Sequence, residues 1–247
     1  MLCIPSIIFL VGLTMVPESG RWLITKQGRN TDDKSSFMDL LKPNMRKALL
    51  LGLSLPFLSQ FSGINAIIYY GPTILQQAGI PVKDSLMSQV FFGVAIVLFT
   101  LIAIWKVDGM GRRKLYLFGT MSAAVSLALT GYCFYTGNTS WPLLFCVLMF
   151  LASFAMSIGP LKFVIASEIF PNAIRGRAMS TSIMMMWIAD AIVGQLTPIS
   201  LTSLGTAATF WIFSVFCVAG FWIVYMFLPE TSGRSLEQIE ASWKTVH

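Results

Sequence analysis

The chain has 247 residues, of which 55% are hydrophobic and only 11% are charged. An average soluble domain is about 25% charged, so this composition and a mean hydropathy of +0.73 indicate a membrane protein. The formal net charge of +6 does not indicate a nucleic-acid-binding protein, because basic and aromatic residues are not interleaved. The only histidine is His247 and no CxxC pair is present, so we expect no metal site and no cofactor.

Seven apolar runs divide the sequence, and most approach the roughly 20 residues that a membrane-spanning helix requires. They lie at about 2–16, 48–71, 86–105, 115–136, 142–165, 179–203 and 206–228. The first run is short, but it lacks a basic n-region and a small-residue cleavage site, which argues against a signal peptide. We therefore predict an all-α membrane protein with about seven transmembrane helices.

The polar connections between these runs alternate in charge. Basic residues are frequent in 17–47, 106–114, 168–178 and the tail, whereas 72–85, 137–141 and the turn near 204 have no excess of basic charge. Basic residues mark the cytoplasmic side of a membrane protein. The pattern therefore predicts a multi-pass protein with Met1 outside and His247 in the cytoplasm.

The second apolar run carries two amides, Gln60 and Asn65, on either side of a Ser-Gly pair. Polar groups in a bilayer must be satisfied without water, and interrupted spans are typical of transporter binding sites. On an unbroken helix Asn65 and Tyr69 lie within about 60° of each other, but Gln60 lies roughly 140° from Asn65. Both amides can face one cavity only if the helix loosens near Ser62-Gly63. The alternative is that they hold neighbouring helices together.

Two charged residues, Lys162 and Asp190, stand within apolar runs. A lone charge at the bilayer centre costs about 2.5–3.5 kcal/mol even on insertion scales. We hypothesise that the two residues form an intramembrane ion pair across adjacent helices. The alternatives are that Lys162 extends to the membrane surface and that Asp190 is protonated or faces a water-filled cavity.

The segment Gly159–Phe163 interrupts the fifth apolar run with a Gly-Pro pair. Such a pair breaks a helix and frees backbone groups to line a cavity. Phe163 is then placed either against a bound ligand or in the core, and both interpretations stay open.

Four short motifs carry acidic and basic residues at the expected cytoplasmic ends of the spans. They are Pro17–Trp22, Val107–Arg113, Glu168–Arg177 and Pro229–Glu237. The charge pattern alone supports two interpretations equally. The residues either form a gating network, or they anchor the protein at the cytoplasmic membrane surface in solvated ion pairs worth about 0–1 kcal/mol each. The candidate gating residues are Glu18, Arg21, Asp108, Arg112, Arg113, Glu168, Arg175 and Glu230.

These motifs, with Gln60–Asn65 and the following tyrosines, resemble the sugar porter family of the major facilitator superfamily. Pro17–Trp22 is similar to the PESPRW motif after the family's sixth helix, and Pro229–Glu237 to the PETKGRSLEE motif after the twelfth. The resemblance implies a helical bundle with seven of twelve helices, lacking its N-terminal half, and a gate that locks the outward-facing state. Its divisions are a transmembrane helix at 1–16, a shortened cytoplasmic loop at 17–47, a six-helix bundle at 48–228 and a cytoplasmic tail at 229–247.

The resemblance also implies which residues bind the sugar: Gln60, Asn65, Tyr69, Phe163 and Asp190. The chain departs from the family at four of the binding positions. Ser59 replaces a second Gln, Phe163 replaces Trp, Asp190 replaces Asn, and Ile96 replaces an Asn. We therefore do not expect glucose in particular.

The expected function is transport of a sugar or polyol by alternating access, not an enzymatic reaction. The expected partners are the sugar, the lipid bilayer and the missing N-terminal half, and the sequence leaves proton coupling open. One alternative is a sugar sensor of the same fold that does not transport. Another is an inactive truncated product. A membrane enzyme is disfavoured, because no nucleophile–base set or metal-ligand cluster lies within the spans.

Overall fold

The computed structural model describes residues 46–77, 79, 81–138, 141–170 and 174–228. Within this part of the chain the secondary structure is helical and contains no strand. The α-helices are α3 (Arg46–Phe61), α4 (Ile64–Gln77), α5 (Val82–Met110), α6 (Arg112–Thr136), α7 (Trp141–Ser153), α8 (Gly159–Ile169), α9 (Arg175–Ser203) and α10 (Thr206–Phe227), and η3 (Phe154–Ile158) is a π-helix.

Six helical segments of the described residues are long and apolar enough to cross a membrane. They are Ala48–Gln76, Leu86–Trp105, Arg112–Thr136, Trp141–Ile169, Arg175–Ser203 and Thr206–Phe227. The fold is the predicted all-α membrane bundle. The expected first span at 2–16, the loop that follows it and the tail lie outside the described residues.

The first of these spans consists of α3 and α4, which are separated at Ser62-Gly63. Gly63 has φ +82°, a conformation that residues with a Cβ rarely adopt. A Cβ at this position would lie 2.5 Å from the ring of Phe213 in α10, so the backbone approaches α10 closely here. The predicted loosening of the helix at Ser62-Gly63 is confirmed.

The span Trp141–Ile169 is built from α7, η3 and α8. The predicted break at Gly159-Pro160 takes the form of a π-helical turn that ends there, with Gly159 N–H donating to the Phe154 carbonyl. Pro160 lies in the first turn of α8, where no backbone donor is needed. The span therefore continues through the Gly-Pro pair, with a local change in helical winding.

The connection between α5 and α6 consists of Gly111 alone, with φ +83° and ψ 141°. Gly109 precedes the connection and lies within α5. Residues 73–77 continue α4, and α5 begins directly after Pro81.

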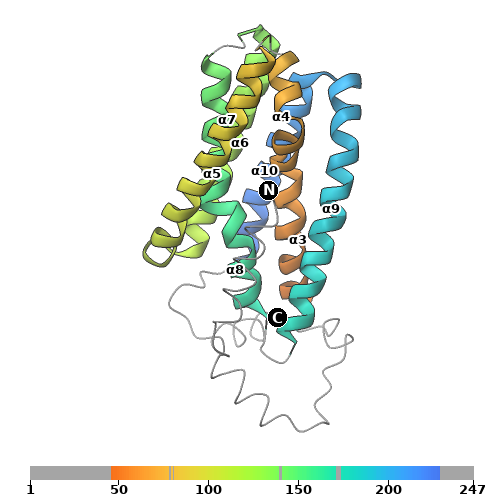
Figure 1. Ribbon diagram of the computed structural model, residues 1–247. Helices are drawn as coiled ribbons and strands as arrows, with labels where there is room; N and C mark the ends of the chain where they lie inside the picture. Colours follow the sequence, from red (N-terminus) through yellow and green to blue (C-terminus); the bar gives the residue numbers. More distant parts are fainter. Residues whose placement is uncertain (1–45, 78, 80, 139–140, 171–173, 229–247) are drawn as a thin grey trace, which may run out of the picture. The chain divides into compact units, whose positions relative to one another are not determined.

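The most extensive helix–helix contacts are those of α6 with α10, followed by α3 with α9 and α6 with α7. Figure 1 shows α3 and α9 running beside each other, with α5, α6 and α7 grouped together. Small residues allow the close approach of α6: a Cβ at Gly119 would lie 1.7 Å from Ser157 Oγ, and one at Gly131 would lie 2.6 Å from the Trp211 ring. Such close contacts are typical of helices that pack within a membrane.

Candidate functional site

The break between α3 and α4 brings the two amides together. Asn65 Nδ2 donates a hydrogen bond to Gln60 Oε1 at 2.9 Å, although the two side chains would point apart on a continuous helix. Asn65 Nδ2 also donates to Asp190 Oδ1 on α9. Gln60 and Asp190 are buried, and Asn65 is half-buried. The structure therefore joins three of the predicted binding residues in one network.

Tyr69 lies one turn beyond Asn65 on α4 and extends the network toward an exposed surface. Its hydroxyl donates to Asp190 Oδ2 at 3.5 Å, and its side chain is 54% exposed. The neighbouring Tyr70 donates to the Gly194 carbonyl of α9 at 3.1 Å. The two tyrosines therefore attach α4 to α9 on the exposed side of the amides.

Lys162 on α8 is 5% exposed, and its ammonium has a different set of partners. It donates to Ser59 Oγ at 3.0 Å, and it lies 5.1 Å from the ring centroid of Phe163 and 5.7 Å from that of Phe154. These separations are typical of cation–π contacts.

The hypothesis of a direct Lys162–Asp190 ion pair is wrong for these described side chains, since no ammonium–carboxylate contact within 4.0 Å joins them. Asp190 accepts from Asn65 and Tyr69 instead, while Lys162 is held by Ser59 and the two rings. Asp190 is still near enough to act electrostatically on the ammonium.

Phe163 is half-buried and contacts Lys162 through its ring face. The same ammonium donates to Ser59 Oγ, and Ser59 directly precedes Gln60. The structure does not place it in the amide–carboxylate network itself. A ligand-facing role for Phe163 stays a prediction.

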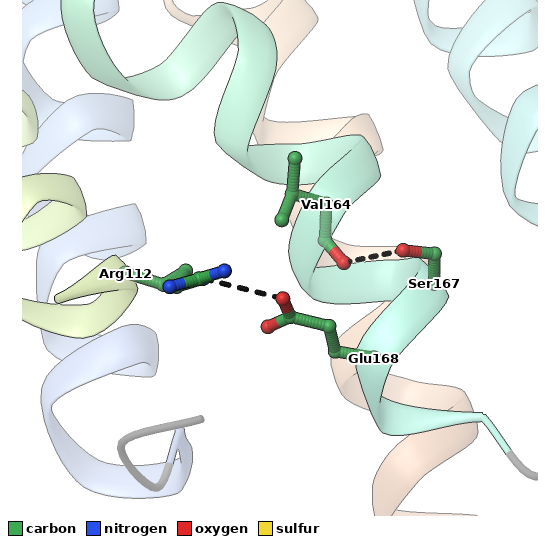
Figure 2. A network of polar contacts seen from close by, with 4 residues as sticks. All are labelled: Arg112, Val164, Ser167 and Glu168. Carbon is green, nitrogen blue, oxygen red and sulfur yellow. Dashed lines mark hydrogen bonds and ion pairs between the residues drawn. The ribbon is translucent and has the colours of Figure 1, made fainter. Parts of the chain in front are cut away.

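Two of the predicted gate residues, Arg112 and Glu168, form an ion pair. Figure 2 shows the Arg112 side chain of α6 pointing at the Glu168 carboxylate of α8. Arg112 Nε and Glu168 Oε1 are 3.2 Å apart, and the two side chains are 18% and 22% exposed. Beside them, Ser167 Oγ donates to the Val164 carbonyl at 2.7 Å.

The other predicted gate residues are distributed differently. Arg175 donates through Nε and Nη2 to the Phe170 carbonyl, each at 3.3 Å. Arg113 Nη2 donates to the Tyr225 carbonyl at 2.7 Å, and its guanidinium lies over the Tyr225 ring. The side chain of Asp108 and all of Glu18, Arg21 and Glu230 lie outside the described part of the structure.

Sequence reasoning missed Ser59 as a functional neighbour. Ser59 was read only as the replacement for an amide, yet its hydroxyl accepts from Lys162 and donates to the Pro56 carbonyl at 2.7 Å. The available signal was a buried lysine in a span, which requires an acceptor. The pattern could not identify that acceptor, because it lies 103 residues away on another helix.

The network is suited to binding hydroxyl groups. It combines amide donors and acceptors, a carboxylate acceptor and a phenol, and it lies beside aromatic rings. Among the described residues, no group of three or more His, Cys, Asp or Glu side chains could hold a metal ion.

Comparison with known proteins identifies the class of protein that this fold and site define. The family model described as "Sugar (and other) transporter" matches residues 30–243. Since this is most of the chain, the protein belongs to the sugar transporter family.

Two of the relatives are named as bacterial sugar–proton symporters. The chain is 35% identical to the arabinose-proton symporter of Bacillus subtilis (strain 168), over 97% of this chain and 58% of the relative. It is 30% identical to the D-xylose-proton symporter of Escherichia coli (strain K12), over 98% of this chain and 56% of the relative. The chain thus spans little more than half the length of the curated relatives it matches.

Solved structures agree with the fold. A crystal structure of a double-tryptophan mutant of XylE superposes with a TM-score of 0.84 at 30% identity, covering 98% of this chain and 57% of that one. The major facilitator proton:xylose symporter XylE bound to 6-bromo-6-deoxy-D-glucose superposes with a TM-score of 0.82 at 31% identity and the same coverage. The bundle is that of the major facilitator superfamily.

Proposed function

We propose that this chain forms part of a carrier that moves a sugar or polyol across the cell membrane by alternating access. The observation that carries the proposal is the polar network at the α3–α4 break, where Gln60, Asn65 and Asp190 meet inside an apolar bundle. A buried polar cluster in a membrane span is a functional site by default. Interrupted helices are typical of such sites in carriers.

In this proposal the network binds the hydroxyl groups of the solute. Gln60 and Asn65 donate and accept, Asp190 accepts, and Tyr69 lies at the exposed entrance. Phe163 supplies an apolar face for the carbon skeleton. Proton coupling is proposed from the relatives, two of which are named as sugar–proton symporters.

We further propose that the chain corresponds to the C-terminal half of the carrier and works with an N-terminal half. Coverage of 56–58% of the relatives agrees with a part of the carrier, and the motifs Pro17–Trp22 and Pro229–Glu237, which resemble those after the family's sixth and twelfth helices, support the C-terminal placement. In the same proposal the C-terminus is cytoplasmic, as the charge pattern predicts. Arg112, Glu168 and Arg175 then belong to a cytoplasmic gate together with the motif residues outside the described part of the chain.

The proposal is tested by sugar binding and by flux. The purified chain in nanodiscs is titrated calorimetrically with arabinose, D-xylose and glucose, and uptake of the sugar that binds is measured in cells lacking their own carriers. Asn65→Ala should weaken binding about tenfold or more, because it removes hydrogen bonds to buried polar groups. The matched control is Gln76→Ala, which removes an exposed amide from the same helix.

Two outcomes would contradict the proposal in different ways. Binding without uptake, also when an N-terminal half is supplied in the same cells, would indicate a sensor. Equal sugar affinities of the Asn65→Ala and Gln76→Ala variants would mean that the network at the helix break is not the sugar-binding site.

A further inference from the structure

A groove lies between two membrane spans, on α6 and α7. Its volume is about 340 Å³, which is within the usual range for ligand pockets. Its lining combines the exposed rings of Phe118 and Phe145 with the buried side chains of Ser126 and Cys146. Because exposed and buried residues line it together, the groove opens at the surface of the bundle.

The serine hydroxyls of this lining already donate hydrogen bonds within the bundle. Ser126 Oγ donates to the Ser122 carbonyl at 2.8 Å. Ser122 Oγ lies 2.7 Å from Ser153 Oγ, and it is the donor of this pair because Ser153 Oγ donates to the Met149 carbonyl. Both serine donors of the lining are therefore in use, and the groove suits a hydrocarbon chain better than a polar solute.

One face of α6, which we call the groove face, carries a lysine followed by four exposed apolar residues of the groove. These residues are Lys114, Phe118, Met121, Val125 and Leu129. At 100° per residue the five positions lie within about 80° of one another. The apolar groove therefore begins one helical turn from an exposed ammonium.

Lys114 is the third of three consecutive basic residues at the start of α6. The other two are engaged with the protein, since Arg112 pairs with Glu168 and Arg113 donates to the Tyr225 carbonyl. Lys114 instead lies on the groove face and is exposed. A basic residue at the end of a membrane span attracts the headgroups of anionic lipids.

The length of the groove matches a lipid chain. Phe118 and Leu129 are about 16 Å apart along α6. This is about half of the roughly 30 Å hydrocarbon core of a bilayer, and therefore about the depth that one leaflet occupies.

The groove also lies on other elements than the proposed sugar site. The polar network is formed by α3, α4 and α9, whereas α6 packs mainly on α10 and α7, and α7 on α6, α5 and η3. An N-terminal half that closes over the network has no need to cover the groove. The surrounding membrane supplies hydrocarbon at this depth.

We propose that the α6–α7 groove binds one acyl chain of an anionic phospholipid whose headgroup pairs with Lys114. The chain packs along the groove face of α6 against Phe145 of α7. The headgroup provides the charge complementarity, because a zwitterionic headgroup carries its own cation and gains less from the lysine. The site is independent of sugar binding.

The test maps lipid contacts with a photoactivatable probe. The full chain is placed in phosphatidylcholine nanodiscs that contain traces of phosphatidylglycerol with a diazirine in the middle of one acyl chain. After illumination, mass spectrometry locates the adducts. Adducts on the α6–α7 groove should be about fivefold more frequent than with the same diazirine in phosphatidylcholine, the preference expected from one basic residue. On the exposed face of α5 the two probes should give equal labelling.

Two variants separate the headgroup from the groove. Lys114→Gln should lower phosphatidylglycerol labelling of the groove to the phosphatidylcholine level, and Lys83→Gln, which removes an exposed lysine at the start of α5, should not. Val125→Trp fills the groove and should lower its labelling by both probes to the level of α5. Val97→Trp is the matched control, because Val97 is an exposed valine on α5. Leu129→Trp repeats the test if Val125→Trp folds poorly.

Three results would overturn the inference. Equal labelling of the groove by the two probes in the wild type would exclude selection of an anionic headgroup. Groove labelling that persists in both tryptophan variants would exclude the groove as the chain's site. Loss of labelling when an N-terminal half is supplied, or cross-links between two copies at the groove face, would mean that protein covers the groove. None of these results bears on the sugar network, so the proposed function is judged separately.

Discussion

Arg112 and Glu168 form an ion pair whose environment decides how much it can contribute. Their side chains are 18% and 22% exposed, so they lie between exposed pairs, worth about 0–1 kcal/mol, and buried pairs, whose disruption costs about 3–5 kcal/mol. Glu168 Oε2 is buried and has no hydrogen-bond partner among the described residues. The carboxylate therefore depends strongly on the guanidinium.

We predict that Arg112→Ala and Glu168→Gln each reduce sugar uptake while leaving membrane insertion intact. The loss of about 1–3 kcal/mol from one conformational state shifts the equilibrium constant between the states by roughly 5-fold to 150-fold. Uptake assays and quantification of the protein in membranes measure the two effects separately. The double variant should transport no worse than the poorer single variant. Unchanged uptake in both single variants would exclude a gating role.

The sequence predicted the contacts of some single residues better than those of others. That Gln60 and Asn65 can face the same side followed from helical arithmetic, because only a break could turn both amides to one side, but their direct hydrogen bond was not predicted. The pairing of Lys162 was predicted wrongly. The choice between Asp190 and Ser59 depends on the relative depth of α3, α8 and α9, and one sequence does not determine how helices pack.

At the scale of elements, the turn at Gly63 is the feature that presents the amides. Gly63 has φ +82°, which disfavours any residue with a Cβ. An added Cβ would also lie 2.5 Å from the Phe213 ring. The sequence indicated this break through its Ser-Gly pair. It indicated an interruption at Gly159-Pro160 but not its π-helical form, in which Gly159 N–H donates to the Phe154 carbonyl.

We predict that Gly63→Ala lowers the melting temperature and weakens sugar binding. The left-handed conformation alone costs a residue with a Cβ about 1–2 kcal/mol, and the contact with Phe213 adds to it. Gly93→Ala is the matched control, because Gly93 lies inside α5 with open space around its would-be Cβ. Thermal unfolding in detergent and calorimetric binding measure the two effects.

A second substitution distinguishes the two causes. Gly63→Ala with Phe213→Leu relieves the steric contact but not the backbone strain, so it should recover the melting temperature only in part. If Gly63→Ala behaves like Gly93→Ala, the turn does not constrain the site.

At the scale of the whole molecule, the spans differ in how much of their apolar surface the described bundle covers. The span Leu86–Trp105 is 11% buried, whereas Arg112–Thr136 is 50% buried. The apolar surface left open along α5 requires lipid or further helices. Composition and charge predicted a multi-span bundle, since both are properties of the chain as a whole. They could not predict which helices are peripheral, because hydropathy does not follow burial: Leu86–Trp105 (mean hydropathy 2.3) is 11% buried, whereas Trp141–Ile169 (2.1) is 56% buried.

The alternation of charge also predicts the orientation, and single cysteines can test it. Asn138→Cys lies in the uncharged connection after α6, and Gly176→Cys lies between Arg175 and Arg177, where its would-be Cβ has open space. A membrane-impermeant maleimide should label Asn138→Cys in intact cells and Gly176→Cys only after permeabilisation. The background is a variant without native cysteines, that is without Cys3, Cys133, Cys146 and Cys217.

The labelling result bears on the whole topology because one span, Trp141–Ile169, separates the two positions. Opposite sides mean that this span crosses the membrane, and the two spans that follow then bring the chain back to the side of Gly176. The tail is therefore cytoplasmic if Gly176→Cys is protected in intact cells. Labelling of both positions from one side would mean that Trp141–Ile169 does not cross. Exchanged labelling would place Gly176 and the tail outside, and would contradict both the predicted orientation and the proposed cytoplasmic gate.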